Sequence, residues 1–212
     1  MNQAPDEPTR PPGSVSPDSP LRDRPGDYPV VGHETVFQGR IFDLVSDQVD
    51  LGVATVVREY VAHPGAVVVM ALDDQDRVLL QSQYRHPARR VLWEPVAGLL
   101  DVAGESELDA AVRELAEEAD LRAASWWRLA QMYASPGGSS EHITIFLARD
   151  LSPTTRPFDR TDEEAMMVPV WVPLDEAVAG VLAGRLESPS TTIGVLAVAA
   201  ARARGWADLQ PA

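Results

Sequence analysis

The feature that most constrains this chain is the run RELAEE at residues 113–118. In a helix of 3.6 residues per turn, Glu114, Glu117 and Glu118 share one face because they are spaced i, i+3 and i+4. Their like charges repel, at a cost of ~0.2–0.5 kcal/mol per pair on an isolated helix. A divalent cation with oxygen ligands removes that cost, and Mg²⁺ prefers one or two carboxylates plus substrate phosphates. From the spacing alone a solvated acidic face is the simpler interpretation, so the flanking residues must decide.

The residues around this helix predict a packed core of strands and helices. The apolar positions on its other face are Leu108, Ala111, Val112, Leu115 and Ala119. The apolar and β-branched runs that we expect to form strands are 66–74, 77–85, 125–135 and 142–151. Pro169 and Pro173 interrupt the run 166–174, which therefore predicts an edge strand. Two closing helices are expected at 174–186 and 191–204.

The flanking residues resemble the Nudix hydrolase signature. That signature is Gly, five residues, Glu, seven residues, then Arg-Glu-apolar-any-Glu-Glu-any-Gly-apolar. From Gly98 the chain reads GLLDVAGESELDAAVRELAEEADL, with Glu105, the seven-residue spacer and the RELAEE run in place. Such a long motif is specific, and the resemblance favours a metal site over a solvated face.

Two positions depart from the signature. Six residues instead of five separate Gly98 from Glu105, and Gly104 supplies the backbone freedom to absorb the extra residue. Asp120 stands where the signature has Gly, at the expected helix end. Asp tolerates the left-handed conformation that is common there. Neither departure removes a carboxylate.

Further segments are similar to the ADP-ribose pyrophosphatase branch of that family. They are REY at 58–60, QYRHP at 83–87, EPVAG at 94–98 and SPGGSSE at 135–141. The resemblance implies hydrolysis of ADP-ribose to AMP and ribose 5-phosphate, with Mg²⁺ as cofactor and Mn²⁺ as an alternative ion. Two alternatives stay open: the same chemistry on another nucleotide sugar, and a catalytically silent domain that binds a nucleotide as a regulator.

The resemblance also implies roles for individual residues at a metal site. We expect Glu114 and Glu118 to bind the metal, with Glu117 able to reach an adjacent ion, and the Ala97 carbonyl as a further ligand. Glu105 is expected to coordinate through water or to hold the loop before the helix. We also place Arg113 and Glu117 in the catalytic set, although as an i, i+4 pair Arg113 is better suited to orienting carboxylates.

The remaining site residues are expected to handle water and substrate. Glu141 matches the loop glutamate that is the general base in close relatives. Arg58 and Arg85 are candidates for binding phosphate or ribose, because a guanidinium matches phosphate bidentately. Glu94, in the EPVAG segment, is assigned to substrate binding with them. The adenine contact of some relatives cannot be transferred, since Arg40 and Ile41 follow Gly39 where an aromatic residue would be expected.

Composition and charge indicate which partners are excluded and how the chain divides into segments. A net charge of -14 argues against nucleic acid, because no basic stripe neutralises phosphates. The sequence contains no apolar run of 18 residues, and we expect a cytoplasmic protein without a membrane partner. We divide the 212 residues into a disordered tail (1–33), an N-terminal β region (34–63) and a Nudix domain (64–206).

The expected fold class is α/β, an α/β/α sandwich with a mixed sheet plus a small N-terminal antiparallel β region. The resemblance implies a homodimer whose N-terminal strands cross to the partner, and apolar strands before His63 suit such a contact. The expected substrate is a small-molecule nucleoside diphosphate sugar. The acidic segment 161–165 receives no role.

Overall fold

A computed structural model describes residues 21–158 and 167–212 of the chain. The acidic segment 161–165 and the first 20 residues of the predicted tail lie outside these ranges. In the described residues, none of the helices is long and apolar enough to cross a membrane.

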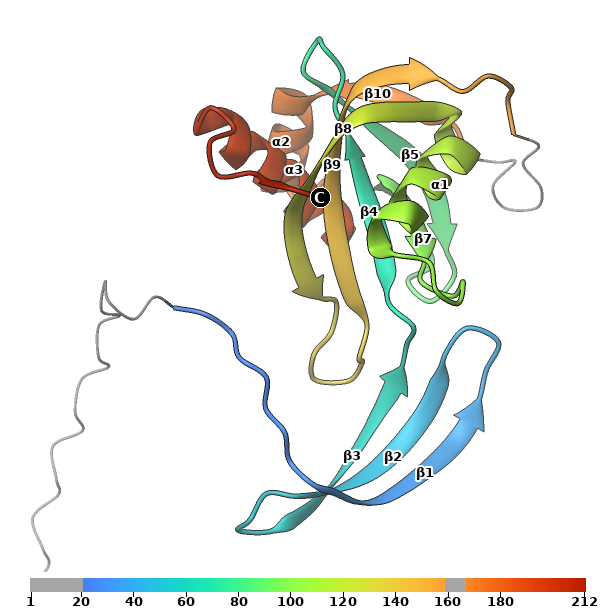
Figure 1. Cartoon of the computed structure of the whole chain (residues 1–212), viewed down its shortest axis with the longest axis vertical. Helices are drawn as coiled ribbons and strands as arrows, with labels where there is room; N and C mark the ends of the chain where they lie inside the picture. The colour runs from blue at the N-terminus through green and yellow to red at the C-terminus, as the bar shows by residue number, and fades with distance from the viewer. Residues whose placement is uncertain (1–20, 159–166) are drawn as a thin grey trace, which may run out of the picture.

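An antiparallel sheet of three strands forms the N-terminal region. Its strands are β1 (Val30–Gln38), β2 (Asp43–Asp50) and β3 (Thr55–Ala62), in the order β1-β2-β3. The sheet projects away from the rest of the molecule (Figure 1). The predicted antiparallel region is thereby confirmed, although β1 begins four residues before the expected boundary at residue 34.

A five-stranded mixed sheet forms the centre of the second region, in the order β11-β8-β9-β4-β7. Its strands are β4 (Ala66–Ala71), β7 (Val96–Leu99), β8 (Leu121–Tyr133), β9 (His142–Pro153) and β11 (Gln210–Pro211). β4 and β9 run parallel, and the other neighbours are antiparallel. Parallel β4 and β9 are far apart in sequence, so the signature helix is part of the long crossover between them.

A second, antiparallel sheet has the order β10-β5-β6. It comprises β5 (Arg77–Arg85), β6 (Arg90–Glu94) and β10 (Pro169–Pro173). β5 has the predicted bounds, and β10 lies at the edge as its prolines predict. The sequence did not predict that β5 and β10 would leave the main sheet, nor the short strands β6 and β7 on either side of Pro95.

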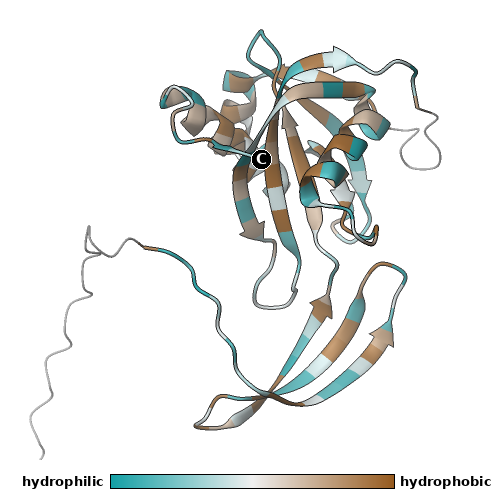
Figure 2. Ribbon diagram, viewed as in Figure 1, coloured by the Kyte–Doolittle hydropathy of each residue, from teal (hydrophilic) through white to brown (hydrophobic). Residues whose placement is uncertain are grey.

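The core lies on both faces of β4, whose residues alternate between two apolar clusters. Val68 and Met70 pack with α2 (Leu174–Leu182) and α3 (Pro189–Ala203). Val67 and Val69 pack with α1 (Glu107–Ala119) on the opposite face. Figure 2 shows the apolar residues along these central strands. The helices therefore cover both faces of the sheets, which confirms the predicted α/β/α sandwich.

Candidate active site

Helix α1 is fixed at both ends by local contacts. Ser106 is the N-cap, and its hydroxyl accepts a hydrogen bond from the Asp109 N–H at 3.1 Å; such a cap stabilises a helix by about 1 kcal/mol. Asp120 ends the helix in the left-handed conformation (φ 54°), and Gly104 has φ +83° in the preceding loop. Both departures from the signature are thus absorbed where the sequence predicted.

The face of α1 that meets the sheet carries carboxylates as well as apolar residues. Ala110, Ala111 and Leu115 are fully buried, and the Glu114 side chain is only 14% exposed. Val112 was expected in the core, but it is 42% exposed, which corrects that prediction. Glu114 and Glu118 face strand β7 together with the apolar residues, whereas Val112 faces solvent.

Glu114 and Glu118 converge on strand β7. A Cβ atom at Gly98 would lie 2.1 Å from the Glu114 carboxyl carbon, so only glycine leaves room for this side chain. One carboxylate oxygen of Glu118 accepts hydrogen bonds from the Ala97 N–H at 3.3 Å and from Gln81 Nε2 at 2.7 Å. The structure therefore brings together three of the four predicted metal ligands, Ala97, Glu114 and Glu118.

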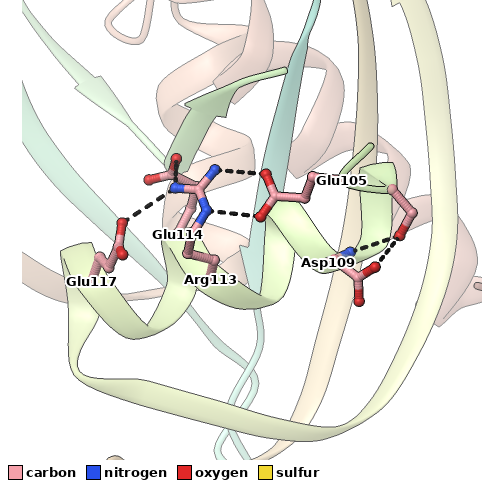
Figure 3. A network of polar contacts seen from close by, with 6 residues as sticks. Glu105, Asp109, Arg113, Glu114 and Glu117 are labelled. Atoms are coloured by element: carbon pink, nitrogen blue, oxygen red, sulfur yellow. Dashed lines mark hydrogen bonds and ion pairs between the residues drawn. The ribbon is translucent and has the colours of Figure 1, made fainter. Parts of the chain in front are cut away.

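Arg113 links three carboxylates, those of Glu105, Glu114 and Glu117 (Figure 3). Its Nε and Nη2 each donate to one oxygen of Glu105 at 2.9 Å. Its Nη1 donates to Glu114 at 2.6 Å and to Glu117 at 3.2 Å. The Arg113 hydrogen bond holds the pKa of Glu105 below its ordinary value, and the Glu105 contact, together with Glu114, raises the pKa of Arg113. Arg113 thus offsets the repulsion that the sequence predicts, and Glu105 anchors the loop to the helix.

The donor set suits Mg²⁺, although the carboxylates do not form a preassembled cage. In residues 21–158 and 167–212, no group of three acidic or histidine side chains is placed to hold a metal ion. Mg²⁺ does not require one, since it keeps several waters and takes one or two carboxylates. Beside Glu118, the amide oxygen of buried Gln81 has no hydrogen-bond partner among the described residues, so it is an acceptor that a metal-bound water would satisfy. Glu114, Glu118 and the Ala97 carbonyl are the residues that would hold the ion.

A pocket of about 700 Å³ opens beside strand β7. Ala97 and Gly98 line it together with Glu141, and Arg85 and Glu94 line it from the second sheet. Arg85 donates to one oxygen of Glu94 through Nε at 3.0 Å and Nη2 at 2.5 Å. The structure therefore gathers these predicted site residues around one cavity.

Some predicted site residues do not line this pocket: Arg58, Arg113, Glu114, Glu117 and Glu118. Arg58 lies exposed on β3, and its guanidinium donates to the neighbouring Val57 carbonyl at 2.9 Å. Only the end of β3 reaches the pocket, at Val61, and Arg58 lies three residues before it. Glu117 also lies apart from the pocket, 41% exposed on the Arg113 side of α1.

Sequence reasoning assigned no site role to Gln81, His63 or Phe42. Gln81 precedes the QYRHP segment, hydrogen-bonds Glu118 and is not part of the pocket lining. His63 and Phe42 line the pocket, as does Ile41, which lies where the adenine contact could not be transferred. Alternation along a strand offered one signal for Gln81. Gln81 is two residues after Leu79 and shares its face of the strand, and Leu79 packs with α1.

Comparisons with known proteins settle the family. The NUDIX domain model matches residues 62–191 of this chain. The chain belongs to the Nudix family. It is 42% identical over 186 residues to an ADP-ribose pyrophosphatase of Mycobacterium tuberculosis strain H37Rv, covering 87% of this chain and 89% of that protein. This Nudix hydrolase is also 35% identical to an ADP-ribose pyrophosphatase of Bacillus subtilis, covering 70% of this chain and 80% of the relative.

A solved structure supports the same Nudix fold. The crystal structure of an ADP compounds hydrolase superposes with a TM-score of 0.69 and covers 87% of this chain and 99% of that one. Its sequence identity of 23% is low, so this likeness bears on the fold alone.

Proposed function

We propose that this Nudix hydrolase cleaves the diphosphate of ADP-ribose to AMP and ribose 5-phosphate with Mg²⁺, and with Mn²⁺ as an alternative ion. The observation that carries the proposal is the convergence of Glu114 and Glu118 on Ala97 and Gly98 of β7. These two β7 residues line a pocket that Glu141 also lines, whereas the Glu114 and Glu118 side chains are not part of the lining. Two relatives that span most of the chain are ADP-ribose pyrophosphatases, which supports this substrate.

These donors form the proposed metal site. Glu114, Glu118 and the Ala97 carbonyl would hold the ion, and Glu117 would reach a second one. When bound, a divalent ion neutralises charge on the diphosphate oxygens and lowers the pKa of a bound water. Arg113 orients Glu114 and Glu117 through its hydrogen bonds, and Glu105 holds Arg113 in place.

Glu141 is proposed as the general base. Its carboxylate takes a proton from water while the water oxygen bonds to one phosphorus. The bond from that phosphorus to the bridging oxygen breaks, and the bridging oxygen stays with the other phosphate. Both products leave as phosphomonoesters, so atoms and charge balance without a redox partner.

The paired Arg85 and Glu94 are proposed as the substrate-binding residues of this pocket. Glu94 is 10% exposed in its side chain and Arg85 is 44% exposed, so Glu94 fixes a guanidinium whose remaining N–H groups can reach phosphate or ribose. We propose Arg58 as a substrate ligand only in the assembled dimer, because it lies away from the pocket of its own chain.

The proposed assembly is a homodimer formed by the N-terminal sheet. Val30, Val31, Val36 and Phe37 of β1 are 52–61% exposed, and Val57 of β3 is 57% exposed. A sheet with such apolar side chains in water requires cover, and a second copy supplies it symmetrically. We also propose that the enzyme is cytoplasmic.

A substrate panel tests the proposed reaction. The purified chain would be incubated with Mg²⁺ and ADP-ribose, GDP-mannose, UDP-glucose, NADH and diadenosine diphosphate, and the products identified by ion-exchange chromatography. We expect ADP-ribose to give the highest kcat/KM, with AMP and ribose 5-phosphate in equal amounts. A higher kcat/KM on another nucleotide sugar would replace the substrate but keep the chemistry. Binding without turnover of any compound would favour the regulator.

A further inference from the structure

The loop that carries Glu141 is attached to the end of strand β3. Val61 N–H donates to the Gly138 carbonyl at 3.0 Å, and Ser140 N–H donates to the Val61 carbonyl at 2.9 Å. The Ser140 hydroxyl accepts from the His63 N–H at 2.9 Å. These contacts form a short parallel bridge, so the position of Glu141 depends on the segment that ends at His63.

The His63 ring faces the Glu141 carboxylate. Its Nε2 lies 3.9 Å from Glu141 Oε1, and the two side chains are 12% and 30% exposed. Within residues 21–158 and 167–212, His63 is the only side chain with a basic nitrogen within 4.0 Å of that carboxylate. Catalytic hydrogen bonds are often long in a site without substrate, and this distance can close with a small movement of the loop.

The tautomer of His63 is fixed by its own turn. The Gly65 N–H donates to Nδ1 at 3.1 Å, which requires a lone pair on Nδ1 and leaves the proton on Nε2. Gly65 adopts φ +96°, and a Cβ there would lie 3.2 Å from the His142 carbonyl. The turn therefore holds the imidazole with its N–H directed at Glu141.

We propose that His63 is a positioning residue for Glu141. The Nε2–H donates to one carboxylate oxygen and fixes its orientation, which leaves the other oxygen to accept the proton of the attacking water. No bond to substrate and no transfer of the His63 proton is involved. The inference rests on the proposed function, since it assigns a partner to the proposed base.

Two substitutions separate this role from a purely structural one. His63→Asn places an amide oxygen near the Nδ1 position, so it keeps an acceptor for Gly65 but does not reach Glu141. His63→Gln is longer and places an amide N–H near the Nε2 position, so it keeps the donor toward Glu141. If His63 positions Glu141, His63→Asn lowers kcat about tenfold with KM nearly unchanged, and His63→Gln recovers most of that loss. If His63 only shapes the turn, the order of the two variants is reversed, which would overturn the proposal.

A double-mutant cycle with Glu141→Gln completes the test. We expect Glu141→Gln alone to lower kcat strongly, and His63→Asn to add less than about a twofold further loss in that background. Full multiplication of the two losses would show that His63 acts independently of Glu141. If Glu141→Gln has no effect, the general base of the proposed function is wrong and the inference falls with it. If Glu141→Gln is damaging but the losses multiply, only the inference fails.

Discussion

The two regions of this molecule both contain β-branched strands, but their valines differ in burial. In the sandwich, Val67, Val68 and Val69 of β4 are at most 1% exposed, because helices cover both faces. In the projecting sheet, Val30 and Val31 of β1 are 54% and 60% exposed. Strand composition alone therefore does not decide burial. The sandwich contains its own covering helices, whereas the cover of the N-terminal sheet is part of the proposed dimer.

We assign the hydrolytic chemistry to the sandwich and the proposed assembly to the N-terminal sheet. Glu114, Glu117 and Glu118 lie on α1 of the sandwich, and Glu141 lies in the loop before β9, which is attached to the end of β3. The N-terminal sheet contributes Ile41, Phe42 and the end of β3 to the pocket. Substitutions in the sandwich should therefore affect turnover without affecting assembly, and substitutions on β1 should do the reverse.

The largest expected effect is on turnover in the sandwich. Glu118→Gln keeps the size of the side chain but removes its charge, and we expect kcat to fall by about 10³-fold or more, about 4 kcal/mol of transition-state stabilisation. Sedimentation should still show a dimer. Glu107→Gln is the matched control, because Glu107 lies on the same helix with its side chain 32% exposed and 3.5 Å from Arg128. That exposed pair should change kcat by less than about twofold. A loss below tenfold for Glu118→Gln would place the metal site elsewhere.

The next effect concerns assembly. Phe37 of β1 is 61% exposed, and Phe37→Asp should weaken the dimer by about 30-fold or more, because an apolar anchor becomes a charge in the contact. Analytical ultracentrifugation across a concentration series measures this. Val53→Asp is the control, since Val53 is 94% exposed in the turn between β2 and β3. A chain that is monomeric before substitution, or equal effects from the two variants, would contradict the assignment of assembly to this sheet.

Truncation sharpens the same comparison. A chain beginning at residue 29 keeps all of β1 and should retain the dimer and its activity. A chain beginning at residue 63 loses the sheet and the Val61 contacts with the Glu141 loop, so both assembly and activity should be lost. Hydrolysis by a monomer of the shorter chain would show that the sandwich is sufficient by itself.

Sequence reasoning succeeded where the signal was local. The end of α1 at the αL residue Asp120 and the bounds of β5 follow from nearby residues. The prediction that Val112 is buried was wrong, because it was inferred from hydrophobicity alone. The inner face of α1 includes the carboxylate of Glu114, for which Gly98 leaves space. Gln81 and His63 could not be assigned, since their partners lie 37 and 78 positions along the chain and only the fold brings them together.

The smallest expected effect is the pH dependence of the N-terminal sheet. His33 Nδ1 lies 2.6 Å from Asp47, and the Tyr60 hydroxyl donates to the other Asp47 oxygen at 2.9 Å. The His33 contact first, and the Tyr60 hydrogen bond next, hold the pKa of Asp47 below its ordinary value. Because the pKa of Asp47 is lower in the folded than in the unfolded chain, the ionised carboxylate stabilises the sheet at pH values above the unfolded-state pKa. This stabilisation is lost as the pH falls through the folded-state pKa.

Dimer dissociation followed from pH 7 to pH 3 tests this sign. We expect the native dimer to weaken below about pH 4, and Asp47→Asn to show less of this change because it no longer titrates. The same pH dependence in both proteins would mean that Asp47 does not contribute.

The central claim is that Glu114 is a metal ligand and Glu141 is the general base. Titrating Mg²⁺ against the rates of Glu114→Gln and Glu141→Gln tests it most directly. For Glu114→Gln we expect a higher Mg²⁺ concentration at half-maximal rate and partial rescue by excess metal. For Glu141→Gln we expect kcat to fall by about 10²–10⁴-fold with an unchanged Mg²⁺ requirement. Rescue of the Glu141 variant by metal, with none for the Glu114 variant, would contradict the account.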